Sequence, residues 1–112
     1  MKALSLEGLK NSLEILYPVT LIMEKNFNRI QLDLIKVHED RRGEGIGREV
    51  MIRLISYSNL HRLQIELTPS GKFGSSKRKL RKFYKKLGFV KNKRRKSISS
   101  YDMIRNYDRV IY

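Results

Sequence analysis

The stretch HEDRRGEGIGREVM, residues 38–51, places three glycines at alternate positions directly before a run with helical periodicity. A glycine inside a helix costs about 1 kcal/mol relative to alanine, so Gly43, Gly45 and Gly47 must serve something other than helix stability. Backbone N–H groups at a strand-to-helix junction converge on one point, where the helix dipole adds positive potential. Because two arginines also precede the first glycine, we expect this loop to bind an anion such as a phosphate.

The glycine spacing argues against two common nucleotide-binding loops. A dinucleotide-binding fold requires G-x-G-x-x-G, but the third position counted from Gly43 and Gly45 is occupied by Arg48. A P-loop requires G-x-x-x-x-G-K followed by Ser or Thr, and no such run is present. The loop therefore matches neither of these two nucleotide-binding patterns.

Strand and helix patterns alternate on both sides of the loop. The predicted elements are a helix over 5–16 with Ser5 as its N-cap, a hairpin of strands 17–25 and 29–37 around a turn at 26–28, a helix over 44–59, a strand over 62–69, a helix over 75–87 capped by Ser75 or Ser76, and one or two strands in 89–112, including YDMIRNY. Strand, loop, helix and strand form a βαβ unit, whose two strands should be parallel.

Side-chain periodicity predicts which faces of these elements are buried. In strand 29–37, strict alternation places Ile30, Leu32 and Leu34 on one face and Gln31, Asp33, Ile35 and Val37 on the other. In helix 75–87, the expected buried residues are Leu80, Phe83 and Leu87, with Gly88 at the C′ position and Lys79, Lys82 and Lys86 on the exposed side.

Length and composition limit the class of protein. The 112 residues suffice for one domain, and 40% hydrophobic residues favour a folded chain. The chain has no cysteine, which excludes disulfides and thiolate chemistry, and its two histidines, His38 and His61, lack nearby ligand partners, so no metal site is expected. No run approaches the ~20 apolar residues of a membrane span or resembles a signal peptide, so we expect a cytoplasmic protein without membrane contact.

The formal charge of +14 is concentrated in one segment. Between Lys77 and Lys96 there are twelve basic residues and no acidic one, which leaves 13 basic residues against 11 acidic ones elsewhere. This basic block is expected to be a solvated helix face, a complement to a cofactor's phosphates, or a docking surface for an acidic macromolecule.

Two motifs together resemble the GNAT superfamily of acyl-CoA-dependent N-acyltransferases. Arg42, Gly45 and Gly47 fit its pyrophosphate-loop pattern Gln/Arg-x-x-Gly-x-Gly/Ala, and KFYKKLGFV, residues 82–90, is similar to its F-Y-x-x-x-G-F segment. A Met-x-Arg strand follows near the end, as in similar short acyltransferases, and is formed here by Met103, Ile104 and Arg105. The resemblance covers residues 17–107.

The resemblance implies one α/β (α+β) domain spanning residues 1–112, with a mixed, mostly antiparallel sheet, a central splayed parallel strand pair and flanking helices. It implies transfer of an acetyl group from acetyl-CoA to a primary amine, with Tyr84 as the general acid that protonates the departing thiolate. The cofactor-binding residues implied or expected near the phosphates are Ile35, Lys36, Val37, Arg42, Gly43, Glu44, Gly45, Ile46, Gly47, Arg48 and Lys77.

The general base stays open. Counting back from the loop, the place of the glutamate that some members use falls on Gln31, which cannot accept a proton at neutral pH. Asp33 and Glu66 could relay the proton through water. They could also be strand residues whose hydrogen bonds are made within the fold and that take no part in catalysis. Tyr84 could likewise be a core residue whose hydroxyl reaches water.

Three departures from the family pattern concern the cofactor and the acceptor. Lys77 stands where many members have asparagine and Leu80 where they have alanine, and only about 37 residues precede the end of the central strand. The acceptor side is thus abbreviated, so we expect either a large acceptor, protein or nucleic-acid associated, or completion of the pocket by a second copy in a homodimer. The alternative function is a basic nucleic-acid-binding module on an acyltransferase-like scaffold.

Overall fold

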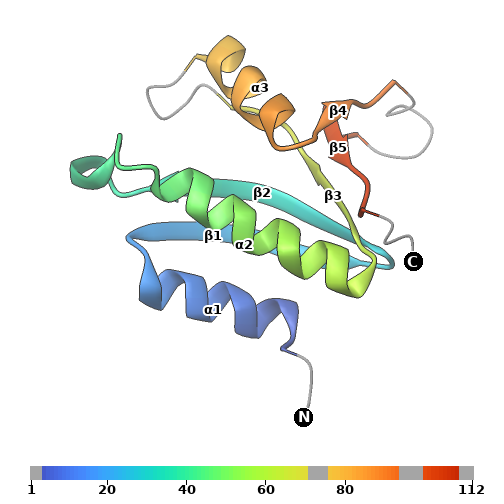
Figure 1. Cartoon of the computed structure of the whole chain (residues 1–112), viewed down its shortest axis with the longest axis horizontal. Coiled ribbons are helices and arrows are strands. Elements are labelled where there is room, and N and C mark those ends of the chain that lie inside the picture. The colour runs from blue at the N-terminus through green and yellow to red at the C-terminus, as the bar shows by residue number, and fades with distance from the viewer. Residues whose placement is uncertain (1–3, 71–75, 94–99, 109–112) are drawn as a thin grey trace.

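The chain alternates short strands with three helices in the order predicted. The computed structural model describes residues 4–70, 76–93 and 100–108. Its elements are α1 (Leu6–Leu16), β1 (Val19–Asn26), β2 (Arg29–Val37), the single 3-10 turn η1 (Glu39–Arg41), α2 (Ile46–His61), β3 (Gln64–Leu67), α3 (Lys77–Lys86), β4 (Val90–Lys91) and β5 (Met103–Arg105). Figure 1 shows their arrangement.

The predicted boundaries of the three helices and of β1, β2 and β3 hold within two residues, and the shifts at α2 have local causes. Helix α2 begins at Ile46 rather than at 44, because Gly45 has a left-handed φ of 78°. It continues to His61, two residues beyond the predicted end, and Arg62 closes it in the same region with a φ of 55°. Ser76 is the N-cap of α3, its hydroxyl accepting from the Lys79 N–H at 3.1 Å, while Ser75 lies outside the described residues.

The five strands form one mixed sheet in the order β1-β2-β3-β5-β4. The β1–β2 hairpin is antiparallel, β2 and β3 are parallel, and β5 is antiparallel to both of its neighbours. This confirms the predicted mixed, mostly antiparallel sheet with a parallel pair at its centre. The parallel pairing is short, because it joins only Arg29–Leu32 to Gln64–Leu67.

Helices α1 and α2 cover one face of this sheet (Figure 1). Leu6 and Leu13 of α1 and Val50, Met51 and Leu54 of α2 are buried in the same apolar cluster as the inward side chains of the strands. The other face of β1 is open to solvent, since Ile22 is 53% exposed. Within the described residues, no helix is long and apolar enough to cross a membrane.

A bulge in β2 changes the predicted faces of that strand. Met23 pairs with Leu32 and Ile22 with Leu34, so Asp33 has no partner on β1. Beyond the bulge Leu21 pairs with Ile35, and paired residues share a face. Ile35 and Val37 therefore lie on the helix-covered face with Ile30 and Leu32, and the prediction that strict alternation continues through residue 37 is wrong.

The predicted buried stripe of α3 is also corrected. Leu80, Phe83 and Leu87 are only half-buried, whereas Tyr84 is buried at 5% exposure. The reason is that Leu80 and Phe83 line a hollow instead of packing fully against the sheet. Gly88 follows the C-cap with a φ of 96°, which confirms its predicted C′ position.

Candidate functional site

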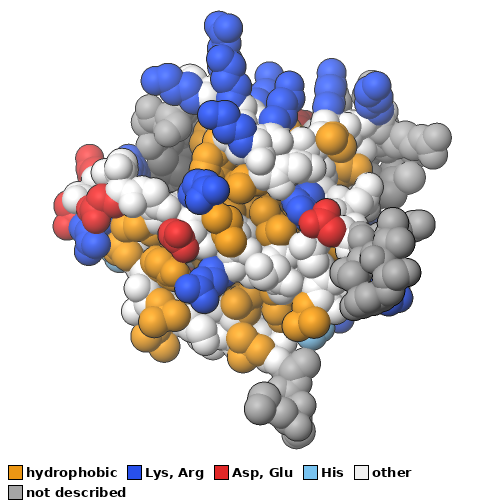
Figure 2. All heavy atoms as spheres, in the orientation of Figure 1, with side chains coloured by type: hydrophobic (Ala, Val, Ile, Leu, Met, Phe, Trp, Pro, Cys, Tyr) orange, Lys and Arg blue, Asp and Glu red, His pale blue; other side chains and the backbone are white. Residues whose placement is uncertain are grey.

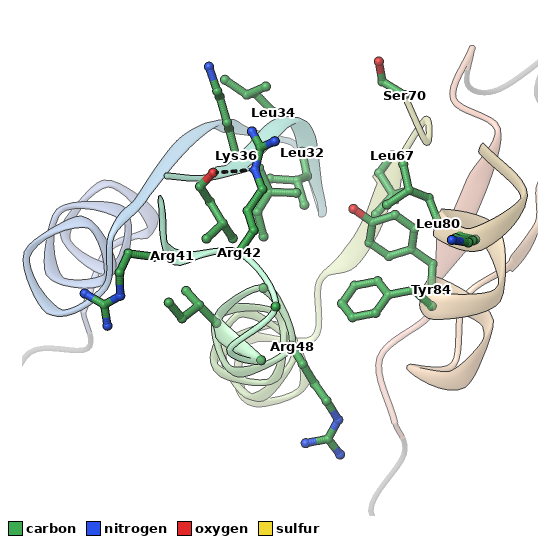
Figure 3. A pocket seen from close by; sticks show the side chains of 18 of the residues that line it. Leu32, Leu34, Lys36, Arg41, Arg42, Arg48, Leu67, Ser70, Leu80 and Tyr84 are labelled. Carbon is green, nitrogen blue, oxygen red and sulfur yellow. Dashed lines mark hydrogen bonds between the residues drawn. The ribbon is translucent and has the colours of Figure 1, made fainter. Parts of the chain in front are cut away.

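A hollow of about 410 Å³ opens where β2 runs past the end of β3 (Figure 3). It is lined by the second half of β2, the glycine loop, the first turn of α2, the segment after β3, and α3. A cavity of this size matches the sites that hold small molecules and cofactors in other proteins. Two strands, β2 and β3, and two helices, α2 and α3, thus meet at one site.

The divergence of the two parallel strands creates this hollow. Beyond Leu32 and Leu67 the strands no longer pair, and residues 33–37 of β2 continue without a β3 partner. Unpaired backbone N–H and C=O groups at the edge of a strand can accept an extended ligand as an additional strand. The expected splayed strand pair is therefore present, with its open side toward the hollow.

The glycine loop presents backbone donors at the edge of the hollow. Gly43 and Gly45 have φ values of 83° and 78°, and a β-carbon at either position would meet no atom within 4 Å. The first intrahelical hydrogen bond of α2 runs from the Glu49 N–H to the Gly45 oxygen at 3.1 Å. The N–H groups of the three residues between them, 46–48, therefore precede the helical ladder and are available to an anion.

Cationic side chains line the same hollow. They are Arg42 and Arg48, together with Lys36 from β2 and Lys79 from α3. The Arg42 Nε donates to the Val37 oxygen at 3.2 Å, which ties the loop to the end of β2 (Figure 3). Positive charge in the same hollow as the N–H groups of the first turn of α2 suits a phosphorylated ligand.

Glu44 is engaged within the loop itself. Both of its carboxylate oxygens accept from the Arg41 guanidinium, at 2.9 and 3.2 Å. This hydrogen bonding lowers the pKa of Glu44 and raises that of Arg41. The Glu44 carboxylate is therefore engaged by Arg41 within the loop. Glu44 does not line the hollow.

Tyr84 reaches the hollow from α3, and Figure 3 shows its hydroxyl directed into it. Its ring packs edge-on against Phe83 and Phe89, with centroid distances of 5.1 and 5.5 Å, so its orientation is fixed on two sides. Burial raises the pKa of Tyr84 to about 12, which keeps the hydroxyl protonated and able to donate at neutral pH.

The structure gathers most of the predicted site residues around the hollow. Those that line it are Ile35, Lys36, Val37, Arg42, Gly43, Gly45, Ile46, Gly47, Arg48 and Tyr84. Glu44 and Lys77 do not. Lys79 lines the hollow and is exposed, as predicted, whereas Lys77 does not line it. Lys79 lies four residues before Phe83, so the i, i+4 rule could have placed it on the lining face.

A group of polar residues lies at the divergence of the strands. The Tyr101 hydroxyl donates to the Asp33 carboxylate at 2.6 Å, and burial together with this contact raises the pKa of Tyr101. Glu66 is fully buried, accepts from Gln31 at 2.9 Å and lies 3.6 Å from the Arg29 guanidinium. Of the two carboxylates considered as a base, Asp33 lines the hollow and Glu66 does not.

Residues 17–91 match the family model of the acetyltransferase (GNAT) domain, so the chain belongs to the GNAT acetyltransferase family. Acetyl-CoA is the acetyl donor of this family. The match includes the glycine loop, the splayed strands and Tyr84. No curated protein sequence matches the chain.

Two solved structures share the fold. Ard1 from Thermoplasma volcanium is 21% identical with a TM-score of 0.55, over 81% of this chain and 64% of that chain. Naa50 from Arabidopsis thaliana, solved in complex with the bisubstrate analogue CoA-Ac-MVNAL, is 18% identical with a TM-score of 0.52, over 80% of this chain and 64% of that chain. The aligned region thus spans just under two thirds of each of these proteins.

Proposed function

We propose that the chain transfers an acetyl group from acetyl-CoA to an amine in the hollow between β2, α2 and α3. The observation that carries this proposal is the meeting of three features in one hollow: the N–H groups in the first turn of α2, the part of β2 beyond its pairing with β3, and the Tyr84 hydroxyl. They fit, in that order, the pyrophosphate, the pantetheine arm and the thioester sulfur of acetyl-CoA.

The residues of the loop and of β2 would hold the donor. The N–H groups at 46–48 and the Arg42 and Arg48 guanidinium groups would bind the pyrophosphate, while the backbone of Ile35–Val37 would pair with the extended pantetheine arm. Gly47 has open space toward the hollow, since a β-carbon there would meet only Val37 Cγ2, at 3.8 Å. A phosphate can therefore approach the backbone closely.

Tyr84 would act at the thioester sulfur. Its hydroxyl is held in the hollow and stays protonated, so it would donate a hydrogen bond, and then its proton, to the thiolate as the amine displaces it. A backbone N–H on the part of β2 that extends beyond β3 would stabilise the negative charge that develops on the carbonyl oxygen.

Asp33 is the carboxylate that we propose for the acceptor side. An alkyl amine with a pKa near 10.4 must lose a proton before it attacks, and an exposed carboxylate at the strand divergence can bind the ammonium and take up that proton through water. Glu66 is less suited, because it is fully buried and already contacts Gln31 and Arg29.

Calorimetric titration of the purified chain with acetyl-CoA tests the donor site. Saturable binding with a stoichiometry of one is expected, and absence of binding would contradict the proposal. Transfer is then measured by mass spectrometry with two acceptors, the peptide MVNAL taken from the Naa50 analogue and a peptide with an acetyl-capped amino terminus and one internal lysine. The expected product is one acetyl group on an amine of at least one acceptor.

A further inference from the structure

The exposed side of α3 and the adjoining β4 carry a dense positive charge. Among the described residues of segment 77–93, nine are cations and none is acidic. The nine are Lys77, Arg78, Lys79, Arg81, Lys82, Lys85, Lys86, Lys91 and Lys93. Figure 2 shows Lys and Arg side chains along the edge of the molecule where α3 and β4 lie.

These cations are not neutralised by the part of the chain that the structure describes. The four ion pairs found there involve Lys10, Arg29, Arg41 and Arg105, none of which belongs to α3 or β4. Like charges packed on one short helix repel one another, at a cost that falls when an external anion binds. Binding of a polyanion to this surface would therefore reduce the repulsion among these cations.

Three of the cations converge on a second hollow, of about 320 Å³. Arg81 and Lys85 lie one helical turn apart on α3, and Lys91 reaches the hollow from β4. Met103 and the Asp102 carboxylate complete its lining, so the three positive charges outnumber the one negative charge. None of these three cations lines the hollow that holds Tyr84, so they are separate from the proposed acetyl-CoA site.

We propose that this surface, the cationic face of α3 and β4 centred on Arg81, Lys85 and Lys91, binds the phosphodiester backbone of a nucleic acid. Helix α3 has ten residues and is about 15 Å long, enough to face several successive phosphates. An acidic protein fits less well, because a protein interface needs an apolar centre and Val90 is the one large exposed apolar side chain on α3 and β4.

The experiment measures binding of the full chain to fluorescent oligonucleotides of 20 nucleotides, as single-stranded RNA, double-stranded RNA and double-stranded DNA, over a series of salt concentrations. The test variant is Arg81→Gln/Lys85→Gln/Lys91→Gln. The matched control, Lys25→Gln/Arg53→Gln/Arg62→Gln, removes the same charge from other exposed positions. A further variant, Lys85→Arg/Lys91→Arg, keeps the charge.

We expect the test variant to bind single-stranded RNA at least tenfold more weakly at low salt, and its slope of log affinity against log salt to fall by about 2, or roughly 0.7 for each lost phosphate contact. The control and the arginine variant should bind like wild type. Equal binding of RNA and DNA would identify the shared backbone as the ligand, and a preference for one would identify the source; both outcomes support the proposal.

Several outcomes would overturn it: no salt-dependent binding by wild type, equal losses in the test and control variants, or tighter binding to poly-glutamate than to any oligonucleotide. Acetyl-CoA titration of the same variants keeps the two proposals distinguishable. The test variant should retain wild-type CoA affinity, and a chain that binds RNA without binding CoA would contradict only the acetyl-transfer proposal. Circular dichroism checks that each variant is folded.

Discussion

At the scale of single residues, Gly47 offers the sharpest test of the loop. A β-carbon at Gly47 would make only an ordinary contact with Val37 inside the protein, and the residue lies in the first turn of α2. Gly47→Ala should therefore fold as well as wild type, or be more stable by up to about 1 kcal/mol. The pyrophosphate-loop pattern allows alanine at this position, so Gly47→Ala should keep CoA affinity by calorimetry. The larger side chain of Gly47→Leu, at a position that lines the hollow, should lower CoA affinity at least tenfold.

Gly45 is less suitable for the same test, because a substitution there would strain the loop whether or not a ligand is bound. Its φ of 78° disfavours any β-branched residue, so Gly45→Val would disturb the loop even without a ligand. If Gly47→Leu binds CoA with wild-type affinity while remaining folded, close approach of the ligand to the backbone is not needed at this position and the proposed pyrophosphate site is wrong.

Tyr84 can be tested by removing only its hydroxyl. The ring is held by Phe83 and Phe89, so Tyr84→Phe should keep the packing and the thermal stability. A role as general acid predicts a kcat lower by about 10²-fold, with CoA affinity unchanged. Steady-state kinetics with whichever peptide is acetylated measures this, and unaltered turnover would leave Tyr84 as a core residue only.

At the scale of elements, one carboxylate joins α1 to the edge of the sheet. Glu14 accepts from the Leu21 N–H of β1 at 2.9 Å and from the Lys10 ammonium at 3.0 Å, and these contacts lower its pKa. A carboxyl whose pKa is lowered by folding stabilises the protein above its unfolded pKa, about 4.5, and loses that contribution as the pH falls through the folded value.

Glu14→Gln should therefore be less stable than wild type at pH 7, by no more than about 1 kcal/mol, because the site is partly exposed. The difference should shrink between pH 7 and pH 3, because wild-type Glu14 takes up a proton as the pH falls through its lowered pKa. Urea unfolding at the two pH values gives both numbers. A difference that is the same at pH 3 and pH 7 would show that the charge of Glu14 contributes nothing.

Sequence reasoning predicted the elements better than the contacts between them. Periodicity and caps located α1, α2 and α3, because Ser5, Ser76 and Gly88 act through their own neighbours in the chain. The bulge at Asp33 could not be foreseen, since it depends on how β1 pairs across the hairpin. That this face of α3 borders a hollow likewise depends on how the helix is set against β2.

The glycine loop was predictable for a corresponding reason. A left-handed backbone at Gly43 and Gly45 is a local property, and glycine is the residue that adopts it without strain. Glu44, in contrast, was expected at the cofactor because of its position in the motif. The structure pairs it with Arg41, a contact that a motif based on spacing does not describe.

At the scale of the whole molecule, Arg105 fastens the ends of two helices to the sheet. It is 9% exposed, donates from Nε to the Leu87 oxygen at 2.7 Å and from its terminal nitrogens to Asn59 and Asp108 at 3.2 and 3.1 Å. A lysine carries all its N–H donors on one nitrogen atom, so it cannot reach these separated acceptors together. The Met-x-Arg pattern in the sequence thus has a structural role.

Arg105→Lys should lower the free energy of unfolding by about 2 kcal/mol and the melting temperature by about 8 °C, because the Leu87 oxygen or the Asn59 side chain loses its charged partner. Arg53→Lys, at an exposed position on α2, is the control and should melt like wild type. Differential scanning calorimetry measures both. Equal melting temperatures for the two variants would contradict the proposed role of Arg105.

The short parallel pairing at the centre of the sheet has a mechanical consequence. Only the four pairs from Arg29–Gln64 to Leu32–Leu67 join the β1–β2 hairpin to the three strands beyond it. The hollow lies where these two parts of the sheet diverge, with the glycine loop on the side of β2 and α3 on the opposite side. A ligand that contacts both the glycine loop and α3 would therefore add a second connection between the two parts, so we expect bound acetyl-CoA to raise the melting temperature of the whole domain.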